Sequence, residues 1–402
     1  MIFTGQGSER VLDSLYIAWQ YVRWNRGKTI VLITSITLIA FLPLALQVVL
    51  NESEQQLRSR AVDTPLLIGA KGSALDLVMS SLYFDDEVPE SINMQAVRLV
   101  DDSGLALAIP LHVRFQARGF PIVGTVLDYL DYRDLKVEQG RMFAVLGEAV
   151  IGADVAESLK IGPGDSLVSS PDNLFDIAGV YPLKMKIAGV LARNHSPDDL
   201  AVFVDTKTAW VIQGFGHGHE DLARSRDATV ILKQDEKTVT ANAKLMQFTE
   251  INVDNIDSFH FHGDESIYPI TAILTVPDDE KSAAILRGRF IDNEQYQAIK
   301  PDDVIDGLME NIFRIRTVIN AVIVIVAIAT VLTIVLVFIL SLRIRRDELE
   351  TIYRIGCSRM TTVRLLAAEI LIIIVACTLL CAALLWLVQT NSGELVRGLI
   401  LR

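Results

Sequence analysis

The sequence predicts a membrane protein in which an α-helical transmembrane part carries a large mixed α/β domain outside the membrane. Three apolar runs predict the spans, at residues 29–50, 313–342 and 365–388. Each is long enough for a helix to cross a hydrocarbon layer of about 30 Å, which takes roughly 20 residues. Between the first two runs lies a more polar stretch, residues 51–312, in which short strand-like and helical patterns alternate. A composition of 51% hydrophobic and 21% charged residues fits both parts.

A short basic segment, residues 343–364, separates the second and third apolar runs and fixes the orientation of the chain. Short loops rich in arginine stay on the cytoplasmic side of a membrane. Residues 1–28 are therefore expected to be cytoplasmic as well, and residues 51–312 and the tail 389–402 to lie outside. The arginines of the segment are Arg343, Arg345, Arg346, Arg354, Arg359 and Arg364.

Residues 1–28 contain an amphipathic pattern that predicts a helix lying in the cytoplasmic interface. Leu12, Leu15 and Trp19 share one face, and basic residues follow. Packing of this helix on the protein itself is compatible with the same pattern. The apolar run that comes next is too long for a cleaved signal peptide and is not followed by a small-residue cleavage pattern. We therefore expect an uncleaved anchor.

Residues 51–312 are expected to form a domain of their own, large enough for two subdomains. Its opening, NESEQQLRSRAVD, is helical in pattern and extends the first span outward. The mixture of elements predicts an α/β fold. The predicted strands are residues 65–68, 105–110, 122–126, 149–151, 186–191 and 201–204, and the predicted helices are residues 153–159, 206–212, 237–248 and 279–289.

Composition and motifs exclude several classes of function. A net charge of -12 argues against nucleic acid as a partner. The sequence contains no G-x-x-x-x-G-K-[ST] phosphate loop, so the chain is not its own ATPase. It also lacks the G-x-S-x-G and H-E-x-x-H patterns, and we predict no catalytic residues. All cysteines lie in the last quarter of the chain, so the large domain needs no disulfide.

Four of the six histidines form two H-x-H pairs, His217 with His219 and His260 with His262. Alternate residues of a strand face the same side, so either pair can offer two imidazoles to one ion, most naturally zinc. Against this stand the glycine-rich surroundings of the first pair and the distance between the pairs along the sequence. From the sequence we assign no metal site, and we keep zinc-linked transport through these histidines as an alternative.

The basic segment carries the most specific motif of the chain. Residues 347–355 have apolar residues at helical spacing, and Gly356 suits a C-terminal cap. The stretch RRDELETIYRIGCSRMTTVRLLAAE resembles the cytoplasmic segment of FtsX-like and MacB-like ABC transporter permeases, whose pattern is of the type RRxEIxxLRxxGxSRxxxxxxxxxE. The inner arginine of that pattern falls on Tyr353 here, and Arg354 follows one residue later. The matching positions are Arg345, Arg346, Glu348, Leu349, Ile352, Gly356, Ser358, Arg359 and Glu369.

In that family the segment is the coupling helix that receives the power stroke of a separate ATPase subunit. The resemblance therefore implies that the first eight matching positions, together with Arg354, are the ATPase-coupling residues. On charge pattern alone, the same segment is compatible with a plain cytoplasmic loop that binds nothing.

A second stretch, GRMFAVLGEAVIGADVAESLKIGPGDSL at residues 140–167, resembles the extracytoplasmic domain of MacB-like permeases. In order, its residues predict a turn, a strand, a short helix and another turn, and the glycines are expected to serve backbone geometry. The matching positions are Gly140, Arg141, Phe143, Glu148, Gly152, Ala156, Leu159, Gly164 and Asp165.

Together the two resemblances imply the permease subunit of an ABC transporter in the bacterial inner membrane. Such a subunit is not an enzyme and has no cofactor of its own, because its partner binds the ATP. The implied partners are two copies of a cytoplasmic ABC ATPase, a second permease in a homodimer or heterodimer, and the lipid bilayer. A periplasmic adaptor, a lipoprotein or a wall hydrolase are further candidates. An FtsX-like signalling module without transport is the alternative function.

The sequence departs from the family in one respect. Permeases of this type usually have four spans, one before the large domain and three after it. This chain shows two apolar runs after the domain, and the tail at residues 389–402 is too short and too charged for another.

The arginine asymmetry predicts the topology, which cysteine labelling can test in a chain whose own cysteines are replaced. A cysteine introduced at Ser59 should react with a membrane-impermeant reagent added outside. A cysteine introduced at Ser358 should react only after the membrane is opened. Protection of the Ser59 position in intact cells would contradict the scheme.

Overall fold

The computed structural model describes residues 6–85, 87–170, 182–218, 231–235, 238–241, 248–344, 350–351, 354 and 359–400. The chain divides into two compact units. Met1–Gln55 and Met309–Arg402 make up the first, which we call the helical unit. Gln56–Leu308 makes up the second, which we call the α/β unit.

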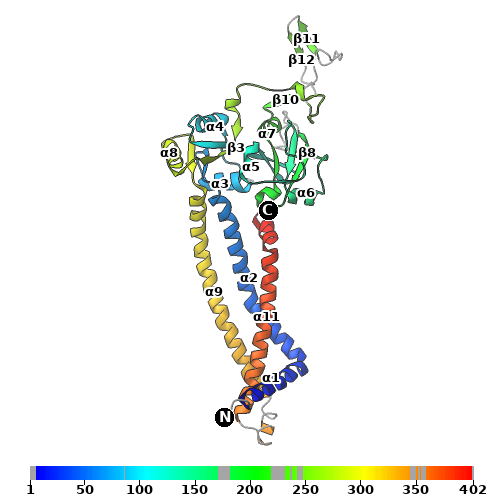
Figure 1. Cartoon of the computed structure of the whole chain (residues 1–402), viewed down its shortest axis with the longest axis vertical. Helices are drawn as coiled ribbons and strands as arrows, with labels where there is room; N and C mark the ends of the chain where they lie inside the picture. Colours follow the sequence, from blue (N-terminus) through cyan, green and yellow to red (C-terminus); the bar gives the residue numbers. More distant parts are fainter. Residues whose placement is uncertain are drawn as a thin grey trace. The chain divides into compact units, whose positions relative to one another are not determined.

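A mixed sheet of ten strands organises the α/β unit (Figure 1). Its order is β16-β1-β15-β3-β4-β9-β6-β8-β5, and β7 pairs with β8 beside this path. The β4–β9 and β6–β8 pairs are parallel, and the other pairs of the sheet are antiparallel. The strands are β1 (Leu66–Ala70), β3 (Ala106–Ala117), β4 (Phe120–Thr125), β5 (Val137–Gly140), β6 (Glu148–Ile151), β7 (Ser166–Val168), β8 (Lys184–Leu191), β9 (Val202–Asp205), β15 (Ala272–Pro277) and β16 (Tyr296–Ile299).

Six described helices accompany this sheet. α4 and α8 lie toward its β1–β15–β3 end and α6 toward its β8 end (Figure 1). The polar side chains that precede two of them cap their first turns: Ser73 accepts a hydrogen bond from the Asp76 amide, and Asp279 accepts one from the Ser282 amide. The helices are α3 (Ala74–Tyr83), α4 (Met94–Asp101), α5 (Leu127–Tyr132), α6 (Ala153–Leu159), α7 (Thr206–Ile212) and α8 (Glu280–Ile291).

Three two-stranded ribbons complete the described part of the unit. They are β2 (Ile92–Asn93) with β14 (Pro269–Ile270), β10 (Gly216–Gly218) with β13 (Phe259–Phe261), and β11 (Ile231–Asp235) with β12 (Thr238–Ala241).

Strand β3 joins two halves of the unit, and its apolar side chains switch from one face of the sheet to the other along its length. Its first half pairs with β15 and its second half with β4, where the register shifts between Val113 and Phe115. An inserted residue moves every later side chain to the opposite face of a strand. Val113 accordingly packs with Val123 in one hydrophobic core, whereas Phe115 packs with Ile122 in another. The bulge therefore lets one strand serve cores on both sides of the sheet.

The stretch at residues 140–167 forms the turns, strand and short helix expected from its pattern. Both guanidinium ends of Arg141 bind the Glu148 carboxylate, one of them at 2.7 Å, and this carboxylate also accepts the amide of Ala144 at 3.0 Å. Gly152 precedes α6, and a β-carbon there would lie 2.3 Å from the backbone oxygen of Asp199. Gly152 thus serves backbone geometry, as the sequence predicted, and the Arg141–Glu148 pair adds a contact that the sequence did not indicate.

The described part of the helical unit contains one helix at the start of the chain, the whole of α11 (Arg359–Ile400) and parts of two other long helices. α1 (Gln6–Trp24) packs against α11, and Ala18 of α1 is fully buried. α2 (Arg26–Val62) also approaches α11, because the Cys377 thiol lies 3.7 Å from the Ile33 carbonyl. α9 (Pro301–Ile344) and α2 are continuous helices whose residues belong partly to each unit.

Among the described residues, two helices are long and apolar enough to cross a membrane. They are Arg26–Val62, with a mean hydropathy of 2.4 over its most apolar window, and Val363–Thr390, with 3.0. Only 6% of the second window is buried, so this is not the core helix of a soluble protein. Within α9 the described residues include the apolar stretch Asn320–Leu336. The second of the three predicted spans, residues 313–342, therefore stays a prediction.

The predicted strands of the domain all overlap observed strands, and the helices predicted at residues 153–159 and 206–212 coincide with α6 and α7. The helix predicted at residues 237–248 is wrong, because Thr238–Ala241 is strand β12. Its residues include β-branched Thr238, Val239 and Thr240, which favour a strand. The last helix, α11, continues into the tail at residues 389–402 and ends at Ile400.

Two glycines with similar backbone angles allow a matched test of the motif. Gly140 has φ +80°, and a β-carbon there would lie 2.2 Å from the Ala188 carbonyl oxygen. Gly119 has φ +86° and nothing within 4 Å of that position. Gly119→Ala should therefore cost only the left-handed backbone penalty, about 1–2 kcal/mol. Gly140→Ala should lower the thermal unfolding temperature clearly further, and equal shifts for the two variants would contradict this role.

Candidate functional site

Most of the predicted coupling residues lie outside the described part of the chain. This applies to Arg345, Arg346, Glu348, Leu349, Ile352, Gly356 and Ser358. Arg354 is helical and exposed, and its guanidinium donates to the Glu350 carboxylate at 2.8 Å. An exposed pair at this spacing adds only about 0.3–0.5 kcal/mol, so it favours a helix here without fixing one. Arg359 begins α11. The coupling helix and its cap at Gly356 stay predictions.

A buried ion pair holds the end of α2 inside the α/β unit. Arg60 contacts both carboxylate oxygens of Asp198, at 2.7 and 2.9 Å, and both side chains are almost completely buried. The Tyr129 hydroxyl lies 2.8 Å from the Arg60 guanidinium and donates to Asp198 at 2.9 Å. The guanidinium also lies over the ring of Phe84, 5.3 Å from its centre. The side chains of Tyr129 and Phe84 thus contact the charge pair from two further segments of the chain.

The electrostatics keep this pair ionised. Burial opposes the charge of Asp198, but the facing Arg60 guanidinium outweighs it and holds the pKa of that carboxyl below its ordinary value. Burial raises the pKa of Tyr129 to about 12, so its hydroxyl stays a donor. Because the pKa of Asp198 is lowered on folding, the stability it confers is present above the unfolded-state pKa. It is lost as the pH falls through the folded-state pKa.

Side-chain hydroxyls bind the carbonyl groups around the last turns of α2. Helix ends leave carbonyls without a partner in the helix, and such groups need another donor when they are not in water. The donors come from α3, from α5 and from Thr64, two residues beyond the end of α2. The pairs are Tyr83 with the Leu57 carbonyl, Thr64 with the Arg60 carbonyl at 2.9 Å, and Tyr132 with the Asp63 carbonyl at 2.7 Å.

This anchor was not found from the sequence. Arg60 stands in a charged helical stretch, where an exposed side chain is the default expectation, and Asp198 stands in a polar turn. The only local signal is the sequence SPDD, in which Ser196 caps a short 3-10 helix that begins at Pro197. Nothing in either segment indicates that the two pair.

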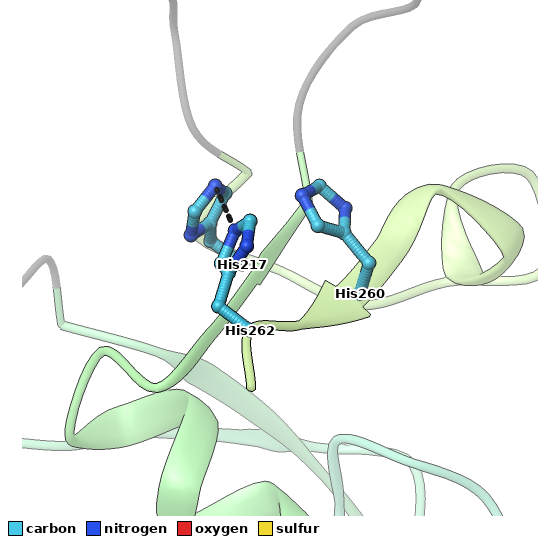
Figure 2. Close-up of side chains that lie close together, drawn as sticks. All are labelled: His217, His260 and His262. Atoms are coloured by element: carbon cyan, nitrogen blue, oxygen red, sulfur yellow. Dashed lines mark hydrogen bonds between the residues drawn. The ribbon is translucent and has the colours of Figure 1, made fainter. Parts of the chain in front are cut away.

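Three of the four clustered histidines meet in space. β10 and β13 are antiparallel, with His217 directly opposite His260. His262 lies two residues beyond His260 and therefore faces the same side (Figure 2). The ring centres of the three imidazoles are 4.8–4.9 Å apart. His219 lies outside the described residues.

The ring nitrogens of this cluster point toward one another. The Nε2 atoms of His217 and His262 are 3.5 Å apart, and one ligand nitrogen from each ring lies within 4.8 Å of the others. In the described part of the chain it is the one group of three metal-ligating side chains at such distances. On the sequence alone, the separation of the two histidine pairs along the chain argues against a shared site. The β10–β13 pairing removes that objection, although His262 and His217 are 45 positions apart.

The chain can now be compared with known proteins. Residues 33–248, more than half of its length, match the family model described as the MacB-like periplasmic core domain. The chain belongs to this family. It is thereby a member of the MacB/FtsX-like ABC transporter permease superfamily, as its motifs indicated. No curated protein sequence matches it.

Two solved structures are similar to the chain at low sequence identity. The periplasmic region of MacB from Actinobacillus actinomycetemcomitans is 11% identical, with a TM-score of 0.36. That similarity covers 63% of this chain and 95% of the other. The extracellular domain of the noncanonic ABC-type transporter YknZ from Gram-positive bacteria is 13% identical, with a TM-score of 0.31. Here 58% of this chain and 98% of the other are covered.

Family membership shows the general type of protein to which the chain belongs. It is a membrane-anchored ABC transporter permease with an extracytoplasmic domain of mixed α/β fold. The family works with an ABC ATPase, and the permease is in general its non-catalytic component. His260 and His262 lie beyond the residues that match the family model.

Proposed function

We propose that this chain is the transmembrane subunit of an ABC transporter of the bacterial inner membrane, in which a separate ATPase drives movement of the α/β unit to export or extract a substrate. The observation that carries the proposal is the match of residues 33–248 to the MacB-like periplasmic core domain. The coupling motif between the last two apolar runs supports it, because in the family that it resembles this segment receives the power stroke of an ATPase. A homodimer or a heterodimer with a second permease would then bind two ATPase copies.

The coupling segment acts in this proposal by docking into the ATPase. Leu349 and Ile352 supply the apolar contact, and Glu348 and Arg354 form a charged rim that orients it. Buried apolar anchors with a polar rim are the usual anatomy of such interfaces. ATP binds to the ATPase, so this chain needs no cofactor for the cycle.

Movement of the membrane helices reaches the α/β unit through continuous helices in this proposal. α2 begins in an apolar stretch and ends at the buried Arg60–Asp198 pair. α9 begins beside β16 and continues into the apolar stretch Asn320–Leu336. A helix without a break transmits a displacement along its axis better than a flexible linker does. Without a transported substrate, the same parts would serve an FtsX-like signalling module.

The test of the coupling segment is Leu349→Asp in the full-length chain, expressed with its ATPase. A carboxylate at the centre of the apolar contact should abolish co-purification of the ATPase, because burying an unpaired charge is strongly unfavourable. Membrane insertion should be unchanged, since the apolar runs are untouched.

The matched control is Val253→Asp, the same kind of change at a side chain that is 91% exposed in the α/β unit. It should leave ATPase recruitment at the wild-type level. Recruitment and ATPase stimulation by Leu349→Asp at the level of this control would refute the assignment of residues 343–364 as the coupling element.

A further inference from the structure

We propose that His217, His260 and His262 form an exchangeable binding site for a divalent late transition metal ion, with zinc as the best fit. The inference stands on the geometry of the α/β unit and does not require the proposed transport function. The site lies on the β10–β13 ribbon, and two of its three ligands lie beyond the residues matched to the family.

The spacing of the nitrogens suits such an ion. Two nitrogens bound to zinc at about 2.0–2.1 Å and a tetrahedral angle lie about 3.4 Å apart. The Nε2 atoms of His217 and His262 are 3.5 Å apart before any ion is placed. His260 faces both rings at centre-to-centre distances of 4.9 and 4.8 Å. One ligand nitrogen from each of the three rings lies within 4.8 Å of the others, so binding of one ion by all three requires the His260 ring to move closer.

Hydrogen bonds to main-chain carbonyls hold the ring of His260 and the backbone of His262. His260 donates from Nδ1 to the Ser258 carbonyl at 3.0 Å, which places the proton of the neutral ring on Nδ1 and makes Nε2 the basic nitrogen. Metal-bound histidines typically have this kind of outer hydrogen bond to a carbonyl or carboxylate. The Tyr268 hydroxyl donates to the His262 carbonyl at 2.9 Å and holds that residue's backbone.

The face of the ribbon opposite the histidines packs against the rest of the α/β unit. Phe259 and Phe261 alternate with His260 and pack against the hydrophobic cores. Their rings cover Gly216 and Gly218 of the facing strand, where an added β-carbon would lie 2.6 Å from ring atoms. The ribbon is therefore fixed by its aromatic face. The three imidazoles lie on the opposite face, away from these aromatic rings.

The donor set selects the class of ion. Three neutral imidazoles suit zinc, copper and nickel, whereas calcium and magnesium prefer oxygen ligands. Structural zinc sites are closed by four protein ligands, and sites with three keep a position for water or an incoming ligand. His262 is exposed and the other two histidines are half-buried. An ion bound here would therefore exchange with the solution or with a partner that carries metal.

The experiment measures zinc binding to the full-length chain in lipid nanodiscs, by competition with a chromophoric zinc chelator. We expect one ion per chain with a dissociation constant in the micromolar range or below, and no competition from magnesium or calcium. Cobalt(II) should give the visible absorption of a four- or five-coordinate nitrogen-ligated site, which reports on the ligands directly.

Three variants identify the ligands. His262→Ala and His260→Ala should each weaken zinc binding more than about 100-fold, since loss even of an outer hydrogen bond to a ligand costs 10–100-fold. His195→Asn is the control: His195 is exposed, outside the cluster and at φ 62°, a conformation that asparagine tolerates. It should bind zinc as the wild type does.

Thermal unfolding without metal separates loss of a ligand from loss of fold. His262→Ala should unfold at the wild-type temperature without zinc, because its side chain is exposed, and should lose the upward shift that zinc gives the wild type. Two results would overturn the proposal: no zinc binding by the wild type at micromolar free zinc, or unchanged binding in both His260→Ala and His262→Ala.

Discussion

The buried pair of Arg60 and Asp198 is the interaction on which the architecture of the α/β unit depends. It closes contacts between the end of α2, helix α5 and the turn before β9, segments that are far apart in the sequence. Removing one partner of a buried pair costs about 3–5 kcal/mol, because the other charge is left without compensation. A pair in this position ties a helix with an apolar membrane-type stretch to the sheet. The same sheet then positions the β10–β13 ribbon and its histidines.

Much of the fold could be predicted from local pattern. Alternating and β-branched runs predicted β1, β4, β6 and β9 to within a few residues. The membrane scheme drawn from the Arg-rich segment stays a prediction. The bulge in β3 could not be predicted, because Val113, Arg114 and Phe115 alternate as in a regular strand, which places both apolar side chains on one face. Strand β12 was mistaken for a helix because its short polar and β-branched sequence carries little periodicity, and pairing with β11 decided its conformation.

The candidate sites show the same division between local and long-range information. The rule that alternate residues of a strand face the same side was enough to predict that His260 and His262 share a face. The approach of His217 depends on the pairing of two strands whose order in the chain says nothing about their register, and only the structure supplies it. The converse holds for the coupling segment, where the sequence motif is specific and most residues lie outside the described part. Neither segment indicates that Arg60 and Asp198 form a pair.

The most direct test of this account is a double-mutant cycle on the pair, read as amide hydrogen exchange of the last turn of α2 in the full-length chain. Arg60→Met and Asp198→Asn should each lower the free energy of local opening by about 3–5 kcal/mol. The double variant should lose much less than the sum, because neither charge is then left alone. Additive losses, or unchanged protection of residues 59–64 in the single variants, would contradict the claim that this pair anchors α2 in the α/β unit.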